Sequence, residues 1–280
     1  MGRAAAFCGR DERARGTSPM TEERLLVEVD GATLEVWRHG EATAPTLVFL
    51  HEGLGCAALW KETPAELCRA LGVGAVVPSR AGYGGSSPVA AAARPLRYLW
   101  DEGVTALPAL LARLGLDDVV LIGHSDGASI ALAYAAGAPP GVRLRGLVVM
   151  APHTFVEDVA LHSIRAAREA YLAGPLRARL ARYHGDNVDG AFWGWNGMWL
   201  DPAFRVAELD AALPRVTAPV LAIQGRRDEY GTLRQLDVLA ERCAGPFERL
   251  VLEDCGHSPH RDQPALTHAA IARFVAALVP

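Results

Sequence analysis

Short apolar runs alternate with longer amphipathic segments along the chain from about residue 25 to its end. The runs ending at Leu50 and Ile122 are continuously apolar, as expected of strands buried on both faces of a parallel sheet. These β-rich runs predict strands at 24–30, 32–38, 46–51, 74–79, 118–123, 145–150, 219–224 and 248–253. Apolar spacing of three and four predicts helices at about 57–71, 96–114, 126–137, 232–243 and 264–278. The alternation predicts an α/β fold with a mostly parallel eight-stranded sheet flanked by helices.

The spacing of these elements also predicts how the chain is organised. Asp30-Gly31 is a hairpin turn signal, so the first two strands are expected to pair antiparallel. The interval between Met150 and the strand at 219 is too long for a simple crossover and too regularly patterned for a loop. We therefore predict a helical cap at 153–212, inserted into a core formed by 20–152 and 213–280. Residues 1–19 show no periodic pattern, and we expect them to be a disordered leader.

Composition and charge limit the kinds of molecule that the protein is expected to bind. The 280 residues, half of them hydrophobic, suffice for one sizeable core. A net charge of −4 spread over interspersed acids and bases argues against nucleic acid or an anionic membrane as a partner, and no apolar run approaches the roughly 20 residues of a membrane span. Five scattered cysteines without a C-x-x-C pair indicate reduced thiols in the cytoplasm. A small-molecule substrate is the expected partner, and a homodimer stays open.

The segment Gly123-His124-Ser125-Asp126-Gly127 matches G-x-S-x-G between an apolar strand and an alanine-rich helix. Glycines allow the tight turn that exposes a serine hydroxyl, and a nearby base makes that hydroxyl nucleophilic. The amides at the start of the helix favour developing negative charge. We predict that Ser125 is a catalytic nucleophile, and that His124 packs in the turn.

A serine of this kind needs a general base and an acid, which follow it along the chain in the order acid, then histidine. His257 follows the last predicted strand and a glycine, and is favoured as the base over His260 on the same loop. Asp228 follows the preceding strand and is favoured as the acid that orients the imidazole. Glu229 and Asp158 are the competing carboxylates.

Four motifs make the chain from about residue 22 onwards resemble the α/β-hydrolase superfamily, in its capped branch of esterases and lipases. They are His51-Glu-Gly-Leu-Gly55, Arg80-Ala-Gly-Tyr-Gly-Gly-Ser86, the Ser125 motif, and Gly225-Arg-Arg-Asp228 with Gly256-His257. The resemblance implies the α/β-hydrolase fold and Ser–Asp–His chemistry. It is less specific for the substrate.

The resemblance also implies an oxyanion hole made of two backbone amides, those of Gly53 and Asp126. The chain departs from the family pattern at Glu52, where many relatives have glycine, and at Ser79, where many have aspartate. An inward carboxylate at Glu52 would oppose a developing oxyanion. We therefore expect Glu52, a candidate pocket residue, to point away or to pair with a base.

The predicted cap holds three of the six tryptophans, Trp193, Trp195 and Trp199, close together. Such a cluster either walls a pocket for an aromatic or acyl group or pins the cap to the core. We expect packing for most of it, with one or two rings reaching the substrate pocket.

These features predict a serine hydrolase that cleaves a small ester or related acyl compound through an acyl-enzyme on Ser125. No cofactor or metal is expected, because serine, base and oxyanion hole suffice for acyl transfer. The alternatives are a C–C bond hydrolase or lactonase of ring-cleavage metabolism, and a non-catalytic small-ligand receptor on the same fold. A lyase or cofactor-independent oxygenase that uses only the His–Asp base is a further rival.

Overall fold

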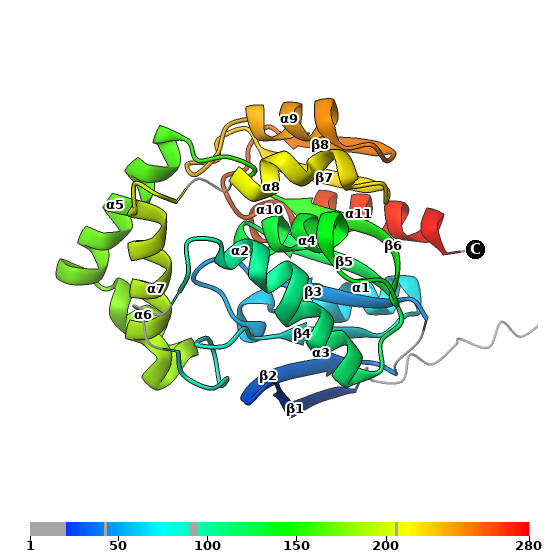
Figure 1. Cartoon of the computed structure of the whole chain (residues 1–280), viewed down its shortest axis with the longest axis horizontal. Helices are drawn as coiled ribbons and strands as arrows, with labels where there is room; N and C mark the ends of the chain where they lie inside the picture. The colour runs from blue at the N-terminus through cyan, green and yellow to red at the C-terminus, as the bar shows by residue number, and fades with distance from the viewer. Residues whose placement is uncertain (1–20, 42–43, 90–93, 205–206, 280) are drawn as a thin grey trace, which may run out of the picture.

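A single sheet of eight strands runs through the middle of the molecule (Figure 1). The computed structural model describes residues 21–41, 44–89, 94–204 and 207–279, so the predicted leader at 1–19 lies outside the described residues. The strands are β1 (Glu22–Val29), β2 (Ala32–His39), β3 (Thr46–Leu50), β4 (Ala75–Pro78), β5 (Asp118–His124), β6 (Arg143–Met150), β7 (Val220–Gly225) and β8 (Phe247–Leu252).

The strand order is β1-β2-β4-β3-β5-β6-β7-β8. β2 pairs antiparallel with both β1 and β4, and every other neighbouring pair is parallel. Asp30 and Gly31 both have positive φ, at 49° and 82°, as the turn of a tight β-hairpin requires. The predicted hairpin and the mostly parallel eight-stranded sheet are confirmed.

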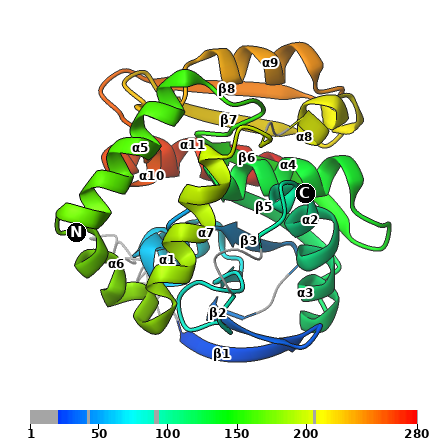
Figure 2. The same ribbon diagram turned by 60° about the vertical axis from the view of Figure 1, so that its left-hand side comes forward.

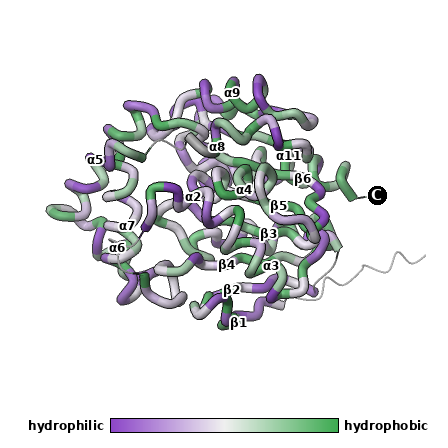
Figure 3. Tube along the Cα trace, viewed as in Figure 1, coloured by the Kyte–Doolittle hydropathy of each residue, from purple (hydrophilic) through white to green (hydrophobic). Residues whose placement is uncertain are grey.

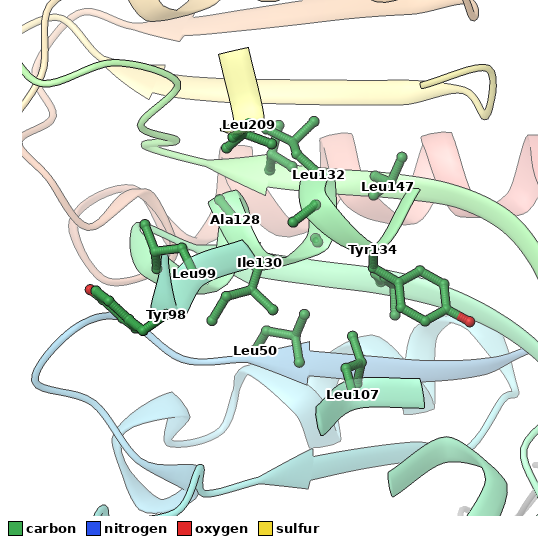
Figure 4. Packing of buried hydrophobic residues seen from close by; sticks show 14 of the residues in the cluster. Leu50, Tyr98, Leu99, Leu107, Ala128, Ile130, Leu132, Tyr134, Leu147 and Leu209 are labelled. Carbon is green, nitrogen blue, oxygen red and sulfur yellow. The ribbon is translucent and has the colours of Figure 1, made fainter. Parts of the chain in front are cut away.

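The central strands are continuously apolar because each of their faces meets a separate core. In β5, Val119 and Leu121 belong to one hydrophobic cluster, whereas Val120 and Ile122 belong to the other. Figure 4 shows the first cluster, where Leu50 and Ile130 pack between the sheet and the helix that follows β5. Figure 3 shows hydrophilic positions gathered on the outer turns of the molecule.

Helices cover both faces of the sheet. The first cluster is covered by α2 (Tyr98–Asp101), α3 (Leu107–Leu114), α4 (Asp126–Gly137), α8 (Ala207–Ala212), η5 (Leu213–Arg215) and α9 (Arg234–Arg242), and η3 (Glu102–Ala106) packs against α4. The second is covered by η1 (Ala57–Trp60), α1 (Thr63–Leu71) and α11 (Pro264–Leu278), with the short α10 (Pro259–Asp262) before α11. Among the described residues, no helix combines the length and apolar character of a membrane span.

Two predicted helices are interrupted. The segment 57–71 divides at Lys61, whose φ of 51° ends the short 3-10 helix η1 before α1 begins. The segment 96–114 contains the π-helical turn η3. Pro108 has no amide hydrogen to donate to the carbonyl of Val104, so a regular α-helical bond cannot form there. In the turn before Pro108, the backbone hydrogen bonds have the π-helical spacing of five residues, as between the Leu107 amide and the Glu102 carbonyl.

Three helices between β6 and β7 stand apart from the sheet. These are α5 (Asp158–Ala173), α6 (Leu176–His184) and α7 (Val188–Leu200), with the short η4 (Gly185–Asn187) between the last two. Figures 1 and 2 show them gathered at one side of the molecule, whereas α8 packs against α4 of the sheet layer. The strand–helix turn after β5 faces this group.

Candidate active site

Ser125 occupies a sharp turn between β5 and α4, with a φ of 53° that non-glycine residues rarely adopt. A Cβ at Gly123 would lie 2.3 Å from the carbonyl oxygen of Gly127, and one at Gly127 would lie 1.9 Å from that of Leu50. Both positions therefore require glycine. Holding a serine in such a conformation costs of order 1–3 kcal/mol, which the surrounding structure must offset.

His257 and Asp228 form a hydrogen-bonded pair, with His257 Nδ1 2.8 Å from Asp228 Oδ1. The Asp228 carboxylate is fully buried and also accepts hydrogen bonds from Gln224 Nε2 at 2.7 Å and the Tyr230 amide at 2.8 Å. Burial alone would raise the pKa of Asp228, but the hydrogen bond and charge of His257 and the Tyr230 amide lower it overall. Asp228 is thus a charged acceptor that fixes the imidazole with Nε2 free to take a proton.

The surroundings of His257 favour its protonated form. Burial alone would lower the pKa of the imidazole, but the hydrogen bond and charge of Asp228, with the charges of Glu229 and Glu52, raise it above its ordinary value of 6.5. A buried carboxylate beside an imidazole stabilises the imidazolium that forms when the ring accepts a proton. The pair therefore has the properties of a general base.

The competing residues lie elsewhere. The ring of His260 packs 4.8 Å from that of Trp60 and 4.9 Å from that of His124, and burial followed by the charge of His124 lowers its pKa well below the ordinary value. Asp158 begins α5, and the exposed Glu229 follows Asp228. Of these carboxylates, Asp228 is the one hydrogen-bonded to His257.

A cavity of about 100 Å³ brings Ser125 and His257 together with the helices of the 153–212 segment. Its walls are mainly apolar. It is lined by Glu52, Gly53, Leu54, Ser125, His153, Ala160, Ile164, Trp195, Trp199, Tyr230 and His257.

Two of the three predicted pocket tryptophans line this cavity, and Trp193 does not. Trp193 instead packs edge-on against Phe192 and Tyr171, with ring centroids 5.0 and 5.6 Å apart. The reason is helical geometry, since Trp195 and Trp199 are four residues apart on one face of α7 and Trp193 points elsewhere. The four-residue spacing of Trp195 and Trp199 in the sequence is the signal that separates them from Trp193.

Gly53 and Asp126, the predicted amide donors, lie beside the serine. Gly53 lines the cavity, and a Cβ there would come within 2.2 Å of Trp195 Nε1, so only glycine fits beneath that ring. Asp126 is the first residue of α4, where amides have no acceptor within the helix. Gly53 thus lies in the cavity wall and Asp126 directly follows Ser125, and the oxyanion hole that their amides would form stays a prediction.

The side chain of Asp126 belongs to a buried network that the sequence did not reveal. It accepts hydrogen bonds from Tyr98 Oη at 2.5 Å and Trp199 Nε1 at 3.2 Å, and Arg80 Nη2 lies 3.8 Å away. Arg80 also donates to the carbonyl oxygen of Glu52 at 3.0 Å. The network ties the nucleophile turn to the Gly53 loop, and it joins loops that no local pattern relates.

Glu52 lines the cavity, and its Oε2 lies 3.5 Å from Nδ1 of the His124 ring. Of the two arrangements expected for Glu52, the structure shows pairing with a base. Burial would raise the pKa of this carboxyl, but His124, His51 and His260 together lower it well below its usual range. Glu52 is therefore ionised at neutral pH.

Within the part of the chain that the structure describes, no group of three or more histidine, cysteine or acidic side chains is arranged to hold a metal ion. Residues 47–270 match the family model described as "Alpha/beta hydrolase family". The chain belongs to this family.

The chain is similar to several proteins along nearly their whole length. It is 26% identical to 2-succinyl-6-hydroxy-2,4-cyclohexadiene-1-carboxylate synthase of Enterobacter sp. (strain 638), over 85% of this chain and 94% of that protein. It is 24% identical to epoxide hydrolase A of Mycobacterium tuberculosis (strain ATCC 25618 / H37Rv), over 90% and 97%. The solved structure of the esterase EaEST from Exiguobacterium antarcticum shares its fold, with a TM-score of 0.70 and 19% identity over 90% of this chain and 98% of that one.

Proposed function

We propose that the protein is a serine hydrolase that cleaves small, uncharged esters or related acyl compounds through an acyl-enzyme on Ser125. The observation that carries this proposal is a strained serine turn in the same cavity as a histidine paired with a buried carboxylate. Family membership supports hydrolase chemistry without defining the bond.

In the proposed reaction, His257 Nε2 takes the proton of the Ser125 hydroxyl as its oxygen attacks the substrate carbonyl carbon. The amides of Gly53 and Asp126 stabilise the resulting oxyanion. When the tetrahedral intermediate collapses, the bond to the leaving alcohol breaks and His257 returns the proton to it. Water then repeats the sequence on the acyl-enzyme, with His257 as its base, and releases the acid and free Ser125.

The nucleophile favours acyl substrates over epoxides, although three of the similar proteins are named epoxide hydrolases. Attack of a serine oxygen on an epoxide carbon would form an ether, which has no carbonyl for water to attack. An acyl-serine is an ester, and the same His257–Asp228 base can hydrolyse it. A serine at this turn therefore supports acyl transfer.

The cavity supports a short, uncharged acyl group. Its volume of about 100 Å³ is small, and its walls are mainly apolar. No lysine or arginine is among the described residues that line it, whereas the ionised Glu52 is. A substrate carboxylate would meet a negative charge there without a cation to bind it.

One similar protein is named a synthase rather than a hydrolase. The second candidate function is therefore a reaction in which the His257–Asp228 pair acts as a base and Ser125 is not acylated. Removal of the serine hydroxyl separates the two. We expect a fluorophosphonate to label Ser125 and short p-nitrophenyl esters to be hydrolysed faster than octanoyl or monosuccinyl esters. Ser125→Ala should lower kcat/KM by about 10⁴-fold or more.

Ser87→Ala is the matched control, because Ser87 accepts a hydrogen bond from the Thr33 amide of β2 and lies outside the cavity lining. It should be labelled and active like the wild type. An unlabelled Ser125 together with full activity of Ser125→Ala would exclude the acyl-enzyme and favour base-only chemistry.

A further inference from the structure

A second carboxylate–imidazole contact lies beside the nucleophile, next to the His257–Asp228 pair. His124 directly precedes Ser125 and is 1% exposed. Its Nε2 is 2.7 Å from the carbonyl oxygen of His257, and its Nδ1 is 3.5 Å from Glu52 Oε2. Because a carbonyl oxygen only accepts hydrogen bonds, Nε2 carries a proton, and Nδ1 is the ring nitrogen that faces the Glu52 carboxylate.

These contacts connect three segments that each supply a part of the proposed machinery. Glu52 belongs to the loop after β3 that carries Gly53, His124 ends β5 before Ser125, and His257 follows β8. The ring of His124 therefore contacts both the loop that carries Gly53, through Glu52, and the backbone of His257.

Glu52 is held in place both at its backbone carbonyl and at its carboxylate. Its carbonyl oxygen accepts hydrogen bonds from His51 Nδ1 at 2.7 Å and Arg80 Nη2 at 3.0 Å. Its carboxylate folds over Gly55, where a Cβ would come within 2.3 Å of Oε2. The carboxylate thus fills a niche that only glycine at position 55 leaves open.

We propose that Glu52 and His124 are positioning residues. They hold the loop that carries Gly53 and the loop that carries His257 in fixed positions around Ser125. This inference rests on the proposed serine-hydrolase function. A displacement of reacting groups by 1 Å can cost about 10²-fold in rate, so a link of this kind acts on kcat rather than on substrate binding.

The pair also shapes the charge around the base. The groups that face His257 are Asp228, Glu229 and Tyr230 after β7, His124 on β5, His153 after β6, and Glu52. Glu52 is one of the carboxylates that raise the pKa of His257.

The test compares three variants by the pH dependence of ester hydrolysis. Glu52→Gln removes the charge, and we expect a ten- to hundredfold lower plateau of kcat, a nearly unchanged KM and an acid limb moved to lower pH. Glu52→Asp keeps the charge but shortens the side chain, so the plateau should fall while the acid limb stays. Glu229→Gln, an exposed charge near His257 without contact to His124, should keep the plateau and move the limb slightly to lower pH.

Titration of the His257 ring by NMR gives a readout that needs no turnover. It should move to lower pH in Glu52→Gln and stay in place in Glu52→Asp. A wild type that is inactive on esters, or active without Ser125, overturns the proposed function. If the wild type is active through Ser125 and both Glu52 variants keep the wild-type plateau, the positioning inference is wrong.

Discussion

The proposed reaction requires His257 to be neutral, because the imidazole must accept the Ser125 proton. Its pKa lies above 6.5, since burial, which lowers it, is outweighed by Asp228 and the neighbouring carboxylates. The neutral fraction therefore falls as the pH drops through this raised pKa. In the proposed mechanism, His257 and Asp228 therefore set the acid side of the pH range of activity.

We predict that kcat/KM declines on the acid side with an apparent pKa above 6.5, measured from pH 5 to 9 on a short p-nitrophenyl ester. Asp228→Asn should lower kcat by about 10⁴-fold, because it removes the acceptor that fixes the proton on Nδ1. His260→Ala is the control and should retain most activity. Loss of activity in His260→Ala but not in His257→Ala would reassign the base.

Local sequence was sufficient to indicate Ser125, Asp228 and His257, because each follows a strand with its own turn signal. The structure brings His257 and Asp228 into hydrogen-bond contact and His257 and Ser125 into one cavity. The contact between Glu52 and His124 was not predictable, since it depends on which loops meet in space. The same holds for the buried contacts of Asp126.

Among the elements, α7 supplies the two tryptophans of the cavity wall, together with the contributions of α5 and the sheet loops. Trp195 and Trp199 face the cavity, and Trp199 also donates to the Asp126 carboxylate. Truncation of Trp199 would disturb the nucleophile turn as well as the wall. Trp195 is the better probe of cavity size.

We predict that Trp195→Ala shifts the preferred acyl chain to longer esters, measured as relative kcat/KM across acetyl to decanoyl p-nitrophenyl esters. Each additional methylene that the enlarged cavity buries should gain up to about fourfold, equivalent to about 0.8 kcal/mol. Trp193→Ala is matched in chemistry but lies outside the cavity, and its chain-length profile should equal that of the wild type. An equal shift in both variants would show that the cavity wall is assigned incorrectly.

The elements themselves were largely readable from the sequence. All eight strands lie within two residues of their predicted bounds, because buried parallel strands are short apolar runs between turn signals. The helices that run over 126–137 and 264–278 have the predicted bounds. The breaks at Lys61 and before Pro108 are local backbone events that apolar spacing does not register.

At the scale of the whole molecule, the cavity forms where the turn after β5 meets α5 and α7. The long interval between β6 and β7 indicated additional helices, but neither its length nor its composition gives the volume they enclose. Cavity size depends on how Ile164, Trp195 and Trp199 pack against the loops of the sheet. Substrate range is therefore a property of the assembled fold.

In the proposed reaction, the acyl group of the substrate becomes covalently attached to Ser125. The most direct test mixes the protein with p-nitrophenyl acetate, stops the reaction in acid within milliseconds, and maps peptides by mass spectrometry. We predict the mass of one acetyl group on the peptide containing Ser125, in a burst stoichiometric with enzyme, and none in Ser125→Ala. Steady turnover with no acylated Ser125 at any time would contradict the proposal.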